Sequence, residues 1–135
     1  MYGAYRVETI RRAEAAAMAL GGDDLLMQRA AAGLAAIVAR ELRARRGKAA
    51  GARVLLMVGS GNNGGDGLYA AVRLARRGIS ISAWRVGASV HATAWDAFRA
   101  AGGREVTAAE AVAELRQVAL LIDAVVGIGG RGGLR

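Results

Sequence analysis

The residues with the clearest chemical potential lie between Gly59 and Gly67, in the stretch GSGNNGGDG. Its first six residues match the pattern G-x-G-x-x-G, with an apolar run before it and a helical pattern after it, which is the context of a dinucleotide-binding loop. Glycines in such a loop permit positive φ and let the backbone approach a pyrophosphate, whose charge the following helix favours. The amides and the carboxylate could also direct oxygen atoms at a hard cation or a polar ring.

The same side chains have a structural alternative. Asn62 and Asn63 tolerate left-handed turns, and Asp66 could simply cap the following helix. An ordinary NAD dehydrogenase would carry an acidic residue about 20 residues further on, where this chain has Arg85, a residue that suits at most a 2′-phosphate. A Walker loop is excluded because no Gly-Lys-Ser/Thr follows the glycines.

A second candidate element starts at Asp123, which ends the apolar run VALLI and precedes a glycine-rich stretch over residues 127–133. If the strands follow the common order 3-2-1-4, the first and fourth strands are neighbours, and ligands bind beyond their carboxyl ends. Because neighbouring strands lie about 4.8 Å apart, Asp123 would lie within roughly 10 Å of Asn62, Asn63 and Asp66. A cation could bridge that gap, and Arg131 would meet a phosphate. The alternative is that Asp123 caps its own loop.

The pattern of apolar residues predicts the elements that position these loops. Two Ala-rich helices, broken by Gly21 and Gly22 and stopped at Gly47, precede a first strand that is buried on both faces, as in a parallel sheet. A right-handed strand–helix–strand unit then follows. The full prediction is helices over residues 5–20, 23–46, 66–77, 91–101 and 108–117, with strands over residues 54–58, 79–86, 104–107 and 118–122.

Composition excludes several classes of protein. The 135 residues suit one domain, and the absence of cysteine together with a single histidine, His91, rules out disulfides, thiolate zinc sites and multi-histidine metal sites. His91 itself is interpreted as a helix start, with acid–base chemistry as the alternative. The net charge of +8 comes with few aromatic residues, so a solvated arginine-rich surface is favoured over a nucleic-acid interface. No apolar run approaches about 18 residues, and the expected location is cytoplasmic, without a membrane partner.

Three strings resemble the NAD(P)H-hydrate epimerase family, also called the YjeF N-terminal domain. They are GSGNNGGDG followed by LYAAVRLARRG, the helical string EAAAMALGGDDLLMQRAAAGLA, and the second glycine loop IDAVVGIGGRGG. The similarity covers nearly the whole chain. It implies an α/β fold, a Rossmann-like three-layer α/β/α sandwich with a mostly parallel sheet and two leading helices. It also implies a homodimeric isomerase that interconverts the R and S forms of hydrated NADH and NADPH (NADHX and NADPHX) in nicotinamide nucleotide repair.

The resemblance further implies roles for individual residues. Potassium would be bound by Asn63 and Asp123, in keeping with the preference of a hard ion for oxygen ligands. Ile128 stands where the family commonly has threonine, so a backbone contact would survive there and a hydroxyl contact would not. The residues implied to bind the hydrated dinucleotide are Asn62, Asn63, Gly64, Gly65, Asp66, Gly127, Ile128, Gly129, Gly130, Arg131, Gly132 and Gly133.

The sequence departs from the family pattern at its end. Family members continue into a strand with a valine-aspartate-x-proline-serine-glycine motif, which supplies a carboxylate thought to transfer a proton, whereas this sequence stops at Arg135. Residues 1–135 are therefore expected to form a single domain that is incomplete at its C-terminal side and at best binds weakly. Asp66 and Asp123 would be the only carboxylates at the crevice, and the catalytic residue stays unassigned.

Two other functions stay open at this point. One is a non-catalytic scaffold of the same fold that binds a nucleotide, RNA or a protein, which the positive charge suits. The other is an NADP oxidoreductase that uses Arg85, although the sequence offers no proton relay for it.

Overall fold

A parallel sheet of four strands forms the centre of the molecule, which is a computed structural model that describes residues 3–128. The strand order is β3-β2-β1-β4, as predicted, so β1 lies between β2 and β4, while β3 and β4 form the two edges. In the register of the sheet, Leu56 pairs with Ala83 of β2 and with Ile122 of β4. The strands are β1 (Arg53–Val58), β2 (Ser80–Arg85), β3 (Arg104–Val106) and β4 (Leu120–Ala124).

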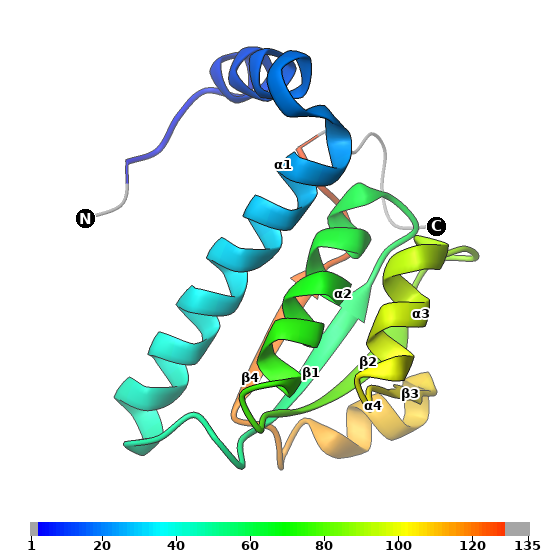
Figure 1. Ribbon diagram of the computed structural model, residues 1–135. Helices are drawn as coiled ribbons and strands as arrows, with labels where there is room; N and C mark the ends of the chain where they lie inside the picture. Colours follow the sequence, from blue (N-terminus) through cyan, green and yellow to red (C-terminus); the bar gives the residue numbers. More distant parts are fainter. Residues whose placement is uncertain (1–2, 129–135) are drawn as a thin grey trace.

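Helices cover the two faces of this sheet unequally. Figure 1 shows α1, α2 and α3 in front of the sheet and α4 behind it, which confirms the three-layer α/β/α fold. Val54 and Leu56 of β1 point into the larger core beneath the three front helices, whereas Leu55 packs with Val106 and Ala111 beneath α4. The helices are α1 (Val7–Arg46), α2 (Asn62–Ala75), α3 (Ala92–Ala100) and α4 (Ala108–Glu114).

The long helix α1 is two helices joined at a kink. Gly22 has φ 74° and ψ 169°, a left-handed φ that favours glycine, and helical turns lie on both sides of it. The predicted pair of leading helices is therefore confirmed, with Gly47 as the left-handed end of the second. The part before the kink, residues 7–21, is called the N-terminal segment below; it turns away from the rest of α1 and lies across the top of the molecule in Figure 1.

Helix α2 starts four residues earlier than the sequence predicts. It begins at Asn62, with Gly61 as its N-cap, so Asn62 and Asn63 belong to its first turn and Asp66 to its second, and Asp66 does not cap it. The glycines of the stretch 59–67 permit positive φ, but none of them adopts it. The physical reason is that the stretch becomes helical from Asn62 onward, and helical residues have negative φ.

These glycines are needed for close packing instead. A Cβ atom on Gly59 would lie 1.9 Å from the carbonyl oxygen of Val125, and one on Gly64 would lie 2.2 Å from the carbonyl oxygen of Gly59. A Cβ atom on Gly67 would lie 2.7 Å from the Cβ atom of Ala124. The start of α2 thus packs directly against the backbone that follows β1 and β4.

The last helix and strand also differ from their predicted bounds. Helix α4 ends at Glu114, and β4 runs to Ala124, so Asp123 lies inside the strand. The reason for the shift is that the backbone N–H groups of Gln117 and Val118 both donate to the carbonyl oxygen of Glu114, which makes 115–118 a turn. Among the described residues no helix is long and apolar enough to cross a membrane.

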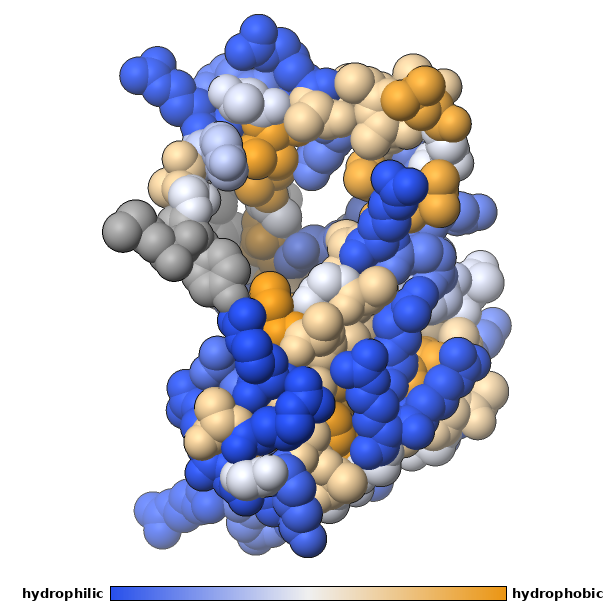
Figure 2. Space-filling model, turned by 60° about the vertical axis from the view of Figure 1, so that its left-hand side comes forward, coloured by the Kyte–Doolittle hydropathy of each residue, from blue (hydrophilic) through white to orange (hydrophobic). Residues whose placement is uncertain are grey.

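Arginine side chains gather at the C-terminal ends of the helices. Arg43 and Arg46 lie in the last turn of α1, Arg73 in that of α2 and Arg99 in that of α3. Cations there complement the helix dipoles. Figure 2 shows hydrophilic side chains gathered over the lower half of the molecule.

Substitution of two glycines by alanine should change stability in opposite directions. Gly59→Ala should lower the free energy of unfolding by about 1–3 kcal/mol, because its methyl group overlaps the Val125 backbone. Gly33→Ala should raise it by about 0.5–1 kcal/mol, because Gly33 lies inside α1 with no atom near its Cβ position. Urea unfolding measures both, and equal effects of the two variants would contradict the packing role of Gly59.

Candidate functional site

A cavity of about 950 Å³ lies at the carboxyl edge of the sheet, where β1 and β4 end. Residues from the two predicted glycine loops face it together, as the strand order requires. Its lining consists of Glu14, Ser60, Gly61, Asn62, Asn63, Asp66, Asp123, Val125, Val126, Gly127 and Ile128.

The predicted site residues divide into three groups. Asn62, Asn63 and Asp66 line the cavity from the start of α2, and Gly127 and Ile128 line it from the segment after β4. Gly64 and Gly65 are buried beneath this lining. The remaining predicted residues, Gly129, Gly130, Arg131, Gly132 and Gly133, lie outside the described part of the chain.

Asp123 occupies the position that the sequence predicts for it, beside the end of β1. It pairs with Met57 in the register of the sheet, and its side chain is exposed to the cavity. Its Oδ1 atom accepts a hydrogen bond of 3.0 Å from the backbone N–H of Val125. Asp123 therefore does cap its own loop, and this hydrogen bond uses one of its two carboxylate oxygens.

The oxygen donors of Asn63 and Asp123 suit a monovalent cation. Both side chains line one cavity, and an amide oxygen and a carboxylate oxygen are the hard donors that such an ion takes. In the described residues, no three histidine, cysteine or acidic side chains gather into a metal site. Asn63 and Asp123 are thus side chains at this edge that could hold a hard cation.

Glu14 is the site residue that the sequence analysis missed. It lies on the N-terminal segment, is half-buried, and lines the large cavity beside Asn62 and Asp66. The expectation that Asp66 and Asp123 are the only carboxylates at this edge is therefore wrong. The Gly21-Gly22 pair signalled a break in the helix, but nothing in the sequence pattern gave the direction in which the segment turns.

The carboxyl group of Asp66 is strongly perturbed by its surroundings. Burial raises the pKa of Asp66 from its ordinary value of 3.8 to about 6; the nearby charge of Glu14 also raises it, while His91 lowers it. A carboxyl group with such a pKa exchanges its proton close to neutral pH, which is the property required of a proton donor or acceptor.

His91 lies beside the start of α2 and caps α3. Its Nδ1 atom accepts a hydrogen bond from the backbone N–H of Ala94, and its ring meets the ring of Tyr69 edge-on at 6.1 Å. The predicted helix start is confirmed, and the position of His91 next to Gly65 also places its charge near Asp66.

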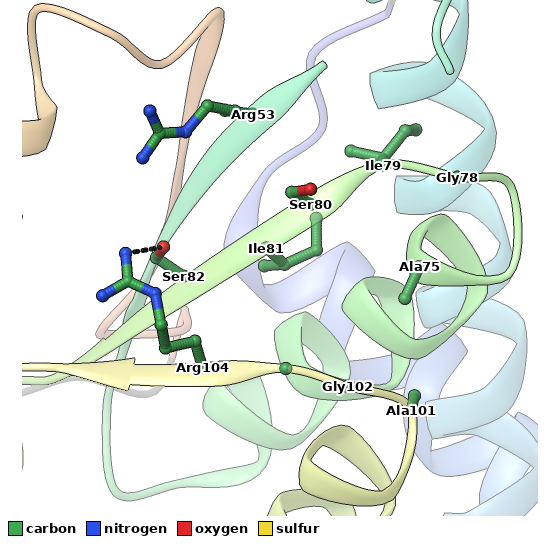
Figure 3. Close-up of a pocket in the computed structure, with 11 residues that line it drawn as sticks. Arg53, Ala75, Gly78, Ile79, Ser80, Ile81, Ser82, Ala101, Gly102 and Arg104 are labelled. Atoms are coloured by element: carbon green, nitrogen blue, oxygen red, sulfur yellow. Dashed lines mark hydrogen bonds between the residues drawn. The ribbon is translucent and has the colours of Figure 1, made fainter. Parts of the chain in front are cut away.

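A second cavity, of about 530 Å³, lies at the opposite edge of the sheet (Figure 3). Two of its lining residues, Arg53 and Arg104, make ion pairs with the buried carboxylate of Glu114, and Arg104 also donates to the hydroxyl of Ser82. Because one carboxylate holds both guanidinium groups, we interpret this cluster as a structural anchor for α4.

Arg85, the residue on which an NADP oxidoreductase would depend, does not line the carboxyl-edge cavity. Its guanidinium carbon lies 5.5 Å from the centre of the Trp95 ring, and its Nη1 atom lies 3.6 Å from Glu105. These contacts use the side chain for packing between β2, β3 and α3, so the geometry gives the oxidoreductase alternative no support.

Comparisons with known proteins agree with these features. The family described as YjeF-related protein N-terminus matches residues 23–135. The chain is 48% identical over 132 residues to the bifunctional NAD(P)H-hydrate repair enzyme Nnr of Mycobacterium leprae, covering 97% of this chain and 27% of that enzyme. It is 40% identical over 126 residues to the NAD(P)H-hydrate epimerase of Microbacterium testaceum, covering 93% of this chain and 46% of that protein. The chain thus spans less than half of either relative.

A solved structure has the same fold. The crystal structure of the yeast protein ynu0 superposes with a TM-score of 0.80 over 99% of this chain and 60% of that chain, at 20% sequence identity. This similarity supports the arrangement of strands and helices described above.

The raised pKa of Asp66 predicts a pH-dependent stability. The folded protein binds this proton more tightly than the unfolded chain, so the stabilisation is complete below about pH 4 and is lost as the pH rises through about 6. Asp66→Asn should therefore raise the free energy of unfolding at pH 7.5, by about 1 kcal/mol after allowance for the partial exposure of the side chain, and should change it little at pH 4. Urea unfolding at both pH values measures this, with Asp96→Asn on α3 as the control. Equal stabilisation at both pH values would contradict it.

Proposed function

Because the chain belongs to the YjeF-related N-terminal family, we propose that it is an epimerase domain that interconverts the R and S forms of hydrated NADH and NADPH. The observation that carries this proposal is the single cavity in which Asn62, Asn63 and Asp66 meet Asp123 across the ends of β1 and β4. The relatives named NAD(P)H-hydrate epimerase and NAD(P)H-hydrate repair enzyme support the substrate class.

The start of α2 is the proposed binding site for the dinucleotide. Free backbone N–H groups and the positive end of a helix dipole favour a phosphate, and Gly61 leaves that helix end open because nothing lies within 4 Å of its Cβ position. Asn62, Asn63, Gly64, Gly65 and Asp66 would contact the ligand here. On the β4 side, the stretch 127–133 would wrap the phosphates of the dinucleotide. Ile128 has no hydroxyl group, so it would contact the ligand through its backbone.

Potassium is the proposed cofactor, with Asn63 and Asp123 as its ligands. The carboxylates of Glu14, Asp66 and Asp123 line the cavity into which an anionic pyrophosphate must enter. A cation between these groups reduces their mutual repulsion and supplies positive charge to the phosphates. The function of the ion would thus be electrostatic.

Epimerisation at the hydrated ring carbon requires the hydroxyl group to leave and to return on the opposite face. Both steps move a proton, so an acid or base must lie at the carbon. The curated relatives extend well past the region that they share with this chain, and we propose that a full-rate site needs residues from such an extension. We further propose a homodimer in the cytoplasm, with the exposed apolar side chains of Val7, Met18 and Leu20 on the N-terminal segment as part of the contact.

Comparison of this chain with a longer version tests the proposed activity. The longer version continues through the strand that carries the valine-aspartate-x-proline-serine-glycine motif of the family. The epimerisation rate of hydrated NADPH should be high in the longer version in potassium buffer and at least about tenfold lower in residues 1–135, because a group required for proton transfer would be missing. No activity in a folded longer version would contradict the epimerase proposal and favour a binding scaffold.

Substitution of the carboxylate ligand tests the proposed potassium site. Asp123→Asn in the longer version should weaken activation by potassium about tenfold or more, a loss of about 1.4 kcal/mol of binding, because an ionised ligand becomes neutral. The rate is measured against potassium concentration at constant ionic strength, with Asp96→Asn as the matched control. Unchanged potassium dependence in Asp123→Asn would remove Asp123 from the ion site.

A further inference from the structure

We propose that Glu14 is a positioning residue of this site that acts through Asp66. Glu14 keeps the Asp66 carboxyl group protonated, so that Asp66 can donate a proton to the hydroxyl group of the ligand. This inference rests on the proposed function and deepens it. It concerns a residue on the N-terminal segment, outside the glycine motifs.

The N-terminal segment crosses the carboxyl edge of the sheet. The kink at Gly22 turns it over this edge, and it arches above a hollow at the top of the molecule (Figure 2). The guanidinium group of Arg11 donates a hydrogen bond of 3.4 Å to the carbonyl oxygen of Ile128, a residue that lines the cavity. The segment therefore contacts the β4 side through Arg11 and places Glu14, almost one helical turn later, beside α2.

Glu14 and Asp66 share two cavities. Together with Asn62 they line the large cavity and also a smaller one of about 190 Å³ beneath the segment. Both side chains are half-buried, so water screens their charges less than at an open surface. The two carboxyl groups thus line the same two cavities from two different helices.

Four charged or titratable groups either share a cavity with Asp66 or act on it through their charge. Glu14 and Asp23 belong to α1, His91 caps α3, and Asp123 lies on β4. Glu14 raises the pKa of Asp66 in addition to the effect of burial, whereas His91 opposes both. Because two neighbouring carboxyl groups resist being ionised together, Glu14 favours the protonated form of Asp66.

A protonated Asp66 can drive the first half of the proposed reaction. Its proton passes to the hydroxyl group on the hydrated carbon, the C–O bond breaks with its electron pair on oxygen, and water leaves. The lone pair of the ring nitrogen forms a C=N bond with that carbon. Water then adds to the opposite face and loses one proton to the solvent, while Asp66 regains one proton from the solvent. The protons balance, and no oxidant or reductant is needed.

Titration of the Asp66 side chain tests the coupling directly and requires no ligand. Carbon-13 NMR of the carboxyl group follows Asp66 in residues 1–135, in Glu14→Gln, and in Glu8→Gln, a control on the same segment that lines neither cavity. The titration midpoint should fall by about 0.5–1 pH unit in Glu14→Gln and stay unchanged in Glu8→Gln. In Glu14→Asp, which keeps the charge, the titration midpoint of Asp66 should lie close to its value in the unsubstituted chain.

The outcomes separate the two proposals. An unchanged midpoint in a folded Glu14→Gln variant, or an equal shift in Glu8→Gln, overturns the role of Glu14, whether or not the protein is an epimerase. If Glu14→Gln does not fold, Glu14→Ala takes its place: a midpoint lowered by about 0.5 pH unit or more supports the role, and an unchanged midpoint overturns it.

A kinetic measurement then links the coupling to the reaction. In the longer version, kcat/KM should decrease above the pKa of Asp66, and Glu14→Gln should move this decrease to lower pH by the same amount as in the titration, because kcat/KM reports the ionisation of the free enzyme. An unshifted pH profile despite a shifted titration would overturn Asp66 as the proton donor. Absence of epimerisation in the unsubstituted longer version would overturn the proposed function and leave the titration result standing.

Discussion

The contact between the backbone after β1 and the backbone after β4 is the constraint on which the rest of the structure depends. The N–H of Gly59 donates to the carbonyl oxygen of Ala124 at 3.0 Å, and the absence of a side chain on Gly59 lets the Val125 backbone lie against it. Gly64 and Gly67 extend this close packing into α2. Larger residues would separate the two loops, and the side chains at the start of α2 would then lose their position opposite Asp123.

The site is assembled from parts of the chain that are far apart in sequence. One wall comes from the start of α2, another from the end of β4, and a third from the N-terminal segment with Glu14. Acidic side chains line this site, whereas arginines gather at the C-terminal ends of the helices, at the other end of the molecule. This separation follows from the topology. In a parallel sheet the carboxyl ends of the strands lie at one edge, and the C-terminal ends of the crossover helices lie at the opposite edge.

The sequence patterns predicted most of the fold because its apolar runs and glycine stops are local signals. The strand order, the break at Gly22 and the end at Gly47 are confirmed. The start of α2 was misplaced because asparagine and glycine favour loops by propensity, while tertiary packing against β4 makes them helical here. Glu14 was missed because its role depends on a turn in space that periodicity does not encode. The roles of Asn63 and Asp123 toward potassium remain predictions, although the two residues share a cavity.

The position of β4 at the edge of the sheet determines how anything added beside it would be oriented. Of the four strands described, β4 pairs on one side only, with β1, and Leu121 on its surface is 44% exposed. An unpaired strand edge is a template for another strand. A fifth strand that continued the parallel pattern would end level with Asp123, and the residue that follows it would point toward the same cavity. Pairing with the free edge of β4 would therefore determine the register of an added strand, and with it the position of the strand's last side chain.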